Sequence, residues 1–155
     1  VIGLMLVRIF GLSVESEHSA RLLGRAMQYI NMIRDGEEDL VLGRQYLPIS
    51  EYEKYGLDQT VILTKEVALD CPSAFCRYLR AQLTRQLGWM AEARRGFHYL
   101  PRSLRIPVST ASEMYDWTAQ QIWADPMIVW RRQVKPTATR VIITGLRSSL
   151  RSSVR

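Results

Sequence analysis

The sequence predicts an all-α protein. Apolar residues recur at helical spacings along most of its 155 residues, and the alternation typical of strands is weak. Serine, glycine and proline stand where helices would begin and end. The chain is 47% hydrophobic, so it can bury a core, and its length fits one domain or part of one. We therefore expect helices packed within a single domain.

The first elements are helices bounded by glycine and serine. Residues 1–10 are apolar and are interpreted as the end of a buried helix that Gly11 stops. The only positive charge lies inside this run, which argues against a signal peptide, and the run is too short to span a membrane. Ser13 or Ser16 can cap the next helix, which is expected to end at Gly43.

The later helices are expected, in order, at 50–55, 61–69, 72–99 and 108–124, with a turn or short helix at 127–134 and a last helix from Pro136. Pro72 suits the first turn of its helix. Pro101 and Pro107 are interpreted as bracketing a connector, because proline disrupts helix interiors. Residues 147–155, rich in arginine and serine, are predicted to form a basic tail that frays.

The helix that ends at Gly43 carries the only dense group of carboxylates in the chain, at Asp35, Glu37, Glu38 and Asp39. At about 100° per residue, one face of this helix holds, within about 60°, Gln28, Asn31, Asp35 and Asp39. Carboxylates four residues apart repel each other, so something outside the helix should offset the repulsion. A divalent cation would do so, because hard ions prefer carboxylate and amide oxygens. A solvated acidic face is the alternative.

The acidic face lies within a longer pattern, Gln28-x-x-Asn31-x-x-Arg34-Asp35-x-x-x-Asp39, followed by Gly43-Arg44-x-Tyr46-Leu47-Pro48. This pattern resembles the second aspartate-rich motif of the squalene and phytoene synthases, which are head-to-head prenyltransferases of the all-α isoprenoid synthase fold. Later segments resemble the same family more loosely, namely Gly96-x-x-Tyr99-Leu100-Pro101, the helix around Tyr115, and Trp130-Arg131-Arg132-x-Val134. One departure is Gly36, where an aliphatic or aromatic residue is expected.

The resemblance implies that residues 1–146 are the C-terminal portion of one such domain, and that the basic tail 147–155 follows it. The helical bundle would then be incomplete, with its N-terminal helices missing. The resemblance also implies metal ligands at Asp35 and Asp39, with Asn31 as a third oxygen donor. The implied metal is Mg²⁺, or Mn²⁺ in its place.

Other residues of the pattern would bind the diphosphate of the substrate. The resemblance assigns Arg44 to this role, as a catalytic residue beside the two aspartates. A guanidinium suits phosphate because its fork donates two parallel hydrogen bonds. The alternative for Arg44 is a surface ion pair with Glu37 or Glu38. The same resemblance implies a set of substrate-binding residues, Gln28, Arg34, Tyr115 and Arg132.

The implied reaction joins two prenyl diphosphates. The product would be phytoene-like from geranylgeranyl diphosphate or squalene-like from farnesyl diphosphate, and NADPH is implied only if squalene is formed. The family also uses a first aspartate-rich motif, which is not found here, since the remaining aspartates stand alone at Asp58, Asp70, Asp116 and Asp125. The 155-residue chain alone is therefore expected to be inactive. The alternatives are a non-catalytic relative that acts in assembly or at a membrane, and a basic helical module.

Four apolar residues are candidates for lining a pocket that takes the prenyl tail, Phe10, Leu23, Met27 and Ile30. Plain core packing is the alternative for each of them. By contrast, Glu51 and Asp58 lie outside the acidic face, and changing either in the complete enzyme is expected to have little effect on catalysis.

Composition and charge narrow the possible partners, metal sites and compartments of the protein. The net charge of +6 is mild, and no nucleic-acid-binding motif accompanies it, so no nucleic-acid partner is expected. Cys71 and Cys76 have neither the spacing nor a nearby histidine for a zinc site, and two cysteines make no disulfide framework. This usage fits a reducing compartment. A cytoplasmic location is expected, with peripheral contact to a membrane as a further partner.

Overall fold

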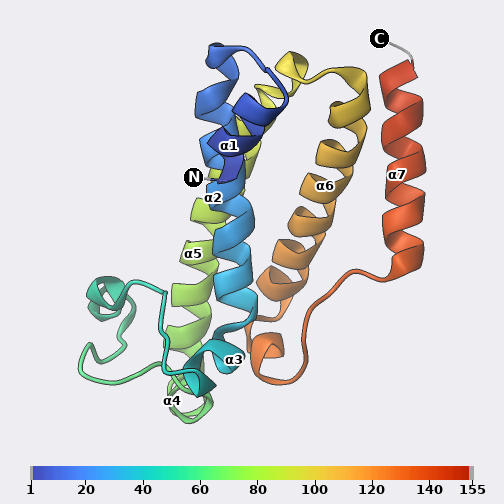
Figure 1. Cartoon of the computed structure of the whole chain (residues 1–155). Coiled ribbons are helices and arrows are strands. Elements are labelled where there is room, and N and C mark those ends of the chain that lie inside the picture. Colours follow the sequence, from blue (N-terminus) through green and yellow to red (C-terminus); the bar gives the residue numbers. More distant parts are fainter. Residues whose placement is uncertain (1, 154–155) are drawn as a thin grey trace.

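The computed structural model describes the backbone of residues 2–153 and the side chains of residues 2–150, and it contains no strand within that range. The α-helices are α1 (Ile2–Ile9), α2 (Glu17–Arg34), α3 (Gly36–Val41), α4 (Lys65–Asp70), α5 (Pro72–Arg94), α6 (Arg102–Ala124) and α7 (Ala138–Ser153), as Figure 1 shows. Short 3₁₀ helices are η1 (Val14–Ser16), η2 (Ile49–Glu51), η3 (Glu53–Tyr55), η4 (Phe97–Tyr99) and η5 (Pro126–Trp130). The predicted all-α class is confirmed.

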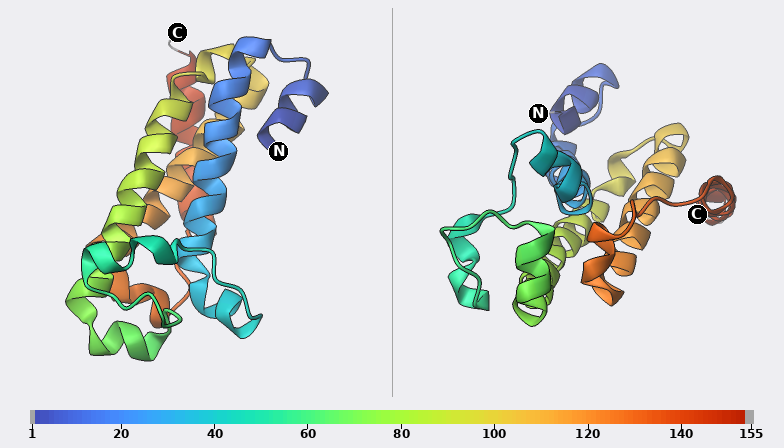
Figure 2. Two further views of the ribbon diagram at one scale, coloured as in Figure 1. Left: turned by 90° about the vertical axis from the view of Figure 1, so that its left-hand side faces the viewer. Right: turned by 90° about the horizontal axis from the view of Figure 1, so that it is seen from below.

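The centre of the molecule is an antiparallel pair of long helices, α2 and α5, with α6 packed alongside (Figures 1 and 2). Ile30 of α2 and Leu83 of α5 are fully buried between them. Tyr52, from the loop region before α4, is also fully buried, and its ring meets Tyr78 of α5 edge-on at 5.0 Å between centroids. Aromatic packing therefore ties the loop region to the central pair.

Helix α1 crosses α2 at a very short distance. A Cβ built on Gly3 would lie 2.1 Å from the carbonyl oxygen of Ala20, so only glycine allows this approach. The prediction of a helix over residues 1–10 is confirmed, but the prediction that it is buried is wrong. Val7 is its only buried residue among those described, because α1 packs on α2 along one narrow face and leaves Ile2 and Ile9 exposed.

Helix α6 begins directly after Pro101 and contains Pro107, so the predicted connector between these prolines is wrong. The amide of Arg105 already donates to the Pro101 carbonyl at 2.9 Å, which places Pro107 in the second turn of the helix. There the missing amide hydrogen deprives only the carbonyl of Ser103, an exposed residue that water can reach. The predicted end of this helix at residue 124 is confirmed.

Some of the remaining predicted boundaries are confirmed and others are wrong. The glycine stops are confirmed, since Gly43 and Gly56 end their elements with φ of 70° and 81°. Only the second half of the helix predicted at 61–69 forms, as α4. The boundary between 146 and 147 falls inside α7, which continues to Ser153, while residues 154–155 lie outside the described range. Within that range, no helix combines the length and the apolar character needed to cross a membrane.

Candidate active site

The acidic segment is built on two helices that meet at Asp35. Helix α2 ends at Arg34, Asp35 has φ −99° and ψ 17°, and α3 starts at Gly36 in a different direction (Figure 1). The prediction of one continuous helix through this segment is therefore wrong. Gly36 explains the break, because glycine is unfavourable by about 1 kcal/mol in a helix interior. Backbone bonds still link Asp35 to Asn31 at 2.8 Å and Asp39 to Asp35 at 2.9 Å, so the four-residue pitch survives.

The carboxylate of Asp35 is held by its neighbour Arg34. The guanidinium donates from Nε at 2.6 Å and from a terminal nitrogen at 2.5 Å, one bond to each carboxylate oxygen. Both side chains are mostly buried, at 15% and 21% exposure, so the pair is partly shielded from water. The hydrogen bond to Asp35 raises the pKa of Arg34 against the opposing effect of burial, with smaller contributions from Tyr115 and Glu38. Arg34, Asp35 and Tyr115 therefore share one electrostatic neighbourhood.

Asp39 and Arg44 lie together at a second place. Both line a cavity of about 40 Å³ beneath α3, and the Arg44 amide donates to the Asp39 carbonyl at 2.8 Å. The ion pair between Arg44 and a neighbouring glutamate does not form among the described residues. Glu38 instead accepts a 2.7 Å hydrogen bond from Gln133, which draws α3 toward the segment after η5. Arg44 itself is exposed.

The other predicted site residues are less enclosed. Gln28 and Arg132 are exposed, and Tyr115 is half-buried against the core. Asn31 is half-buried, and its Oδ1 atom is buried without a hydrogen-bond partner in the protein. The structure therefore gathers Arg34, Asp35 and Tyr115, gathers Asp39 with Arg44 separately, and leaves Gln28 and Arg132 at the surface.

A metal ion would find oxygen donors here but no ready cage. Among the described residues, no three acidic, histidine or cysteine side chains are grouped so as to hold one. Both oxygens of Asp35 are taken by Arg34, whereas Asn31 offers an unused buried amide oxygen. Mg²⁺ is commonly held by one or two carboxylates together with substrate phosphates. The donor chemistry of Asn31, Asp35 and Asp39 fits that mode of binding.

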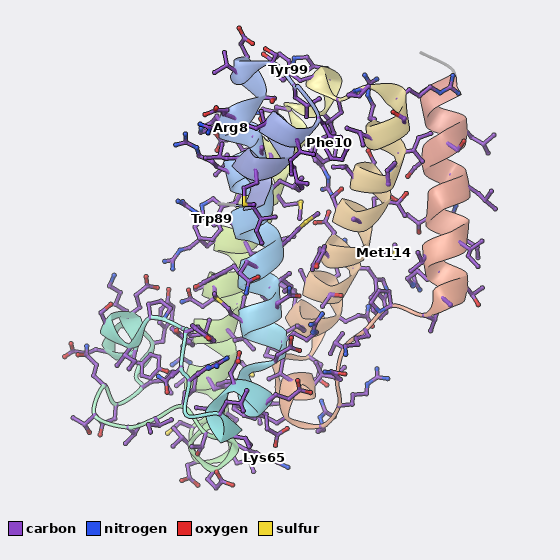
Figure 3. The ribbon with its side chains drawn as sticks, in the orientation of Figure 1. Arg8, Phe10, Lys65, Trp89, Tyr99 and Met114 are labelled. Atoms are coloured by element: carbon purple, nitrogen blue, oxygen red, sulfur yellow. The ribbon has the colours of Figure 1, made fainter. Side chains whose placement is uncertain are left out.

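An apolar cavity of about 170 Å³ lies at the other end of α2, between α1, η4 and the start of α6. Phe10, Leu23 and Met27 line it, as one of the two interpretations expected, and Figure 3 shows Phe10 at the same end of the bundle as Tyr99. Ile30 is instead fully buried in the central core. The lining of the apolar cavity also includes residues that the sequence interpretation did not assign to it, namely Ala93, Gly96, Phe97, Leu100, Leu104 and Val108. The motif beginning at Gly96 was the available signal for Gly96, Phe97 and Leu100, and no motif covers the other three.

A network of polar side chains near the middle of α5 was missed entirely. Gln82 is fully buried; it accepts from Tyr29 at 2.6 Å and from Arg85 at 2.9 Å, and it donates to Glu51 at 3.1 Å. Arg85 also donates to Glu51 at 2.7 Å. These bonds, the one from Gln82 first, lower the pKa of Glu51. These contacts give Glu51 a role in stability, and the expectation that changing it has little effect on catalysis stays a prediction.

Comparison with known proteins identifies relatives of this chain. The model of the squalene/phytoene synthase family matches residues 1–140. Phytoene synthase 2 of Zea mays is 33% identical over 121 residues, covering 74% of this chain and 29% of that protein. Phytoene synthase of Mycobacterium tuberculosis is 31% identical over 135 residues, covering 86% and 44%. Presqualene diphosphate synthase of Zymomonas mobilis is 29% identical over 161 residues, covering 97% and 50%. The chain thus spans at most half the length of these relatives.

Proposed function

The chain belongs to the squalene/phytoene synthase family, with an all-α fold of the isoprenoid synthase type, and we propose that it carries the diphosphate-binding end of a head-to-head prenyltransferase. The names of its relatives, phytoene synthase and presqualene diphosphate synthase, support this class of reaction. The product would be phytoene from geranylgeranyl diphosphate, or squalene from farnesyl diphosphate with NADPH as reductant.

The observation that carries the proposal is the end of α2. Arg34 and Asp35 form a fork-shaped pair there, beside an amide oxygen of Asn31 that has no partner in the protein. An unpaired buried acceptor is unfavourable by about 1–3 kcal/mol, so a ligand that binds this oxygen would remove that cost. We assign the oxygens of Asn31, Asp35 and Asp39 to holding Mg²⁺, with Mn²⁺ as a substitute.

The cationic side chains would bind and orient the diphosphate. Arg44 and Arg132 are exposed and show no ion pair among the described residues, so both guanidinium forks are free to donate to phosphate oxygens. Arg34 and Tyr115 lie close to each other and to Asp35. Gln28 is exposed one helical turn before Asn31. When bound, the metal would neutralise charge on the departing diphosphate. Donors fixed in place stabilise that same charge as the carbon–oxygen bond breaks.

The apolar cavity would receive part of a prenyl chain. Phe10, Leu23 and Met27 present hydrocarbon surface to it, and among the described residues only Ser16 and Ser19 bring hydroxyl groups to its lining. Burying the tail there would remove its hydrocarbon surface from water and so contribute to substrate binding. A product without charged groups would also be compatible with this lining.

The test compares the 155-residue chain with the protein encoded by the complete reading frame that contains it. Each is incubated with Mg²⁺ and labelled geranylgeranyl or farnesyl diphosphate, and the extracted hydrocarbons are analysed. We expect the complete-frame protein to form phytoene, presqualene diphosphate or squalene. We expect no product from the 155-residue chain, because it supplies one acidic motif where the family uses two. A complete-frame protein that binds Mg²⁺ and pyrophosphate no better than its Asp35→Asn, Asp39→Asn variant would support the non-catalytic alternative instead.

A further inference from the structure

Arg44 stands at the start of the segment that connects α3 to α4, directly after Gly43 (Figure 1). Gly43 has φ of 70°, and its amide donates to the Leu40 carbonyl at 2.9 Å. The amide of Arg44 donates to the Asp39 carbonyl at 2.8 Å. These two bonds form the Schellman arrangement that closes many helices. The backbone of Arg44 is thereby tied to that of Asp39 on the side of α3.

Gln45 fixes the chain on the other side of Arg44. Its half-buried amide donates from Nε2 to the Tyr52 hydroxyl at 2.8 Å and accepts at Oε1 from the Leu63 amide at 3.3 Å. Burial raises the pKa of Tyr52 to about 12, so its hydroxyl stays uncharged near neutral pH. We call Gln45, Tyr52 and Leu63 the amide clamp. The clamp joins the start of the connecting segment to two places further along it.

The amide clamp is anchored to the core of the molecule. Tyr52 is fully buried and Leu63 is buried at 5% exposure. The ring of Tyr52 packs on Tyr78 of α5, whose hydroxyl donates to the Pro48 carbonyl at 3.3 Å. All three clamp residues line the same 40 Å³ cavity as Asp39 and Arg44. The clamp therefore connects the packed core to the place where these two predicted site residues meet.

We propose that Gln45 is a positioning residue that acts on the diphosphate through Arg44. The inference rests on the diphosphate-binding role proposed above for Arg44. With its backbone fixed on both sides, Arg44 has only its side-chain torsions to order when it binds phosphate oxygens. Its guanidinium also starts from a fixed place relative to Asp39, so the arginine and the predicted metal ligand reach the same diphosphate together.

The experiment is calorimetric titration of the complete-frame protein with Mg²⁺ and pyrophosphate. Gln45→Met keeps the length of the side chain and removes both hydrogen bonds, so it should weaken pyrophosphate binding about tenfold. Tyr52→Phe removes only the bond at Nε2 and should weaken binding about threefold. In steady-state kinetics, Gln45→Met should raise the KM of the prenyl diphosphate more than it lowers kcat. A mere loss of folded enzyme would lower kcat and leave KM unchanged.

A double-mutant cycle with Arg44→Ala tests whether Gln45 acts through the arginine. In the Arg44→Ala background, Gln45→Met should cause no further loss of pyrophosphate binding. Equal losses in both backgrounds would overturn the proposal, and so would unchanged binding by Gln45→Met when Arg44 is present. If Arg44→Ala itself bound pyrophosphate as tightly as the wild type, the diphosphate role of Arg44 would be wrong, and this inference would fall with it.

The matched control is Gln59→Met. Gln59 is a glutamine of the same connecting segment, but it is exposed and donates only to Glu53, at 3.2 Å. Its replacement should leave pyrophosphate binding unchanged, and a loss equal to that of Gln45→Met would overturn the proposal. Circular dichroism checks that each variant keeps its helix content. If Gln45→Met unfolds, Tyr52→Phe, which retains the buried ring, takes its place in the cycle with Arg44→Ala.

Discussion

Two arginine–carboxylate pairs in this molecule have the same chemistry and different settings. Arg85 and Glu51 belong to different elements and are joined through buried Gln82 to Tyr29 of α2. Arg34 and Asp35 are adjacent in the chain, and their fork closes no loop between elements. The first pair therefore holds α2, α5 and the loop region together. The second adds little to tertiary structure, because its partners are already tethered by the backbone.

This difference separates a structural pair from one that a ligand can exchange. Breaking the Arg85–Glu51 pair would leave two half-buried charged groups without this partner and would loosen the network around buried Gln82, which is unfavourable. Breaking the Arg34–Asp35 pair in favour of phosphate and metal replaces each bond with another of the same kind. The unpaired Oδ1 of Asn31 lies one turn away on the same helix and has no protein partner. We infer that the first region is built for stability and the second for binding.

The largest effect is expected at the exchangeable pair, in catalysis. In the complete-frame protein, Asp35→Asn should lower product formation by about a hundredfold, the scale of losing one preorganised electrostatic group. The loss should fall mainly on kcat, and additional Mg²⁺ should restore part of it. Thermal unfolding should shift little, since Asn keeps the size of the side chain. Steady-state kinetics and calorimetric titration with Mg²⁺ and pyrophosphate measure both.

The matched control for that substitution is Glu37→Gln. Glu37 is exposed on α3, two residues from Asp35. Replacing it with glutamine removes the same charge from a residue outside the predicted ligand set. Near-normal turnover by Asp35→Asn at low Mg²⁺ would show that the acidic face is merely solvated. If Glu37→Gln lost as much product formation, the effect of Asp35→Asn would come from the change in net charge and not from a lost metal ligand.

The next effect is expected at the structural pair, in stability. Gln82→Leu removes three hydrogen bonds and leaves Tyr29, Glu51 and Arg85 with unmet partners in a partly buried place. The free energy of unfolding should fall by about 2 kcal/mol, which urea denaturation can measure. A change smaller than the scatter of surface mutants would contradict the structural role assigned to this network.

The pH dependence of stability should follow Glu51. Its pKa is lowered in the folded protein from the usual 4.5, by the hydrogen bond from Gln82 first. A depressed carboxyl pKa contributes stability that is present above the unfolded value and is lost as the pH falls through the folded value. The free energy of unfolding should therefore drop more steeply below pH 4.5 in the wild type than in Glu51→Gln. If the free energy of unfolding fell equally with pH in the two proteins, Glu51 would not be the source of the acid sensitivity.

The sequence predicted the helices well where one repeat governs them. The apolar positions of α5 recur at helical spacing, and Phe75, Leu79 and Leu83 are indeed buried. Pro107 misled because proline was taken to exclude a helix, although here it deprives only the carbonyl of exposed Ser103 of its partner. The same reasoning places the acidic segment on a helix but misses the break before Gly36. The low helix propensity of glycine allows the chain to change direction there.

Long-range contacts and inverted faces could not be predicted in this way. Glu51 and Arg85 are far apart in sequence, and no local spacing indicates that they meet. In α7 the aliphatic side is turned outward, so an amphipathic pattern alone would have assigned Leu146 to the core and Ser148 to solvent. The candidate ligands follow from a motif, whereas the hold of Arg34 on Asp35 needs the local geometry at the end of α2.

The smallest effect is expected one turn along α5 from Gln82, at Gln86. Both glutamines are fully buried, yet neither side-chain polar atom of Gln86 has a hydrogen-bond partner in the protein. A buried amide without partners is unfavourable by about 1–3 kcal/mol, and leucine has a similar volume. Gln86→Leu should therefore raise the free energy of unfolding by up to about 1 kcal/mol, opposite in sign to Gln82→Leu. Urea denaturation compares the same substitution at two buried positions one turn apart, one with a hydrogen-bonded amide and one without. If Gln86→Leu destabilised the protein as much as Gln82→Leu, an internal water or ligand would have to bind Gln86.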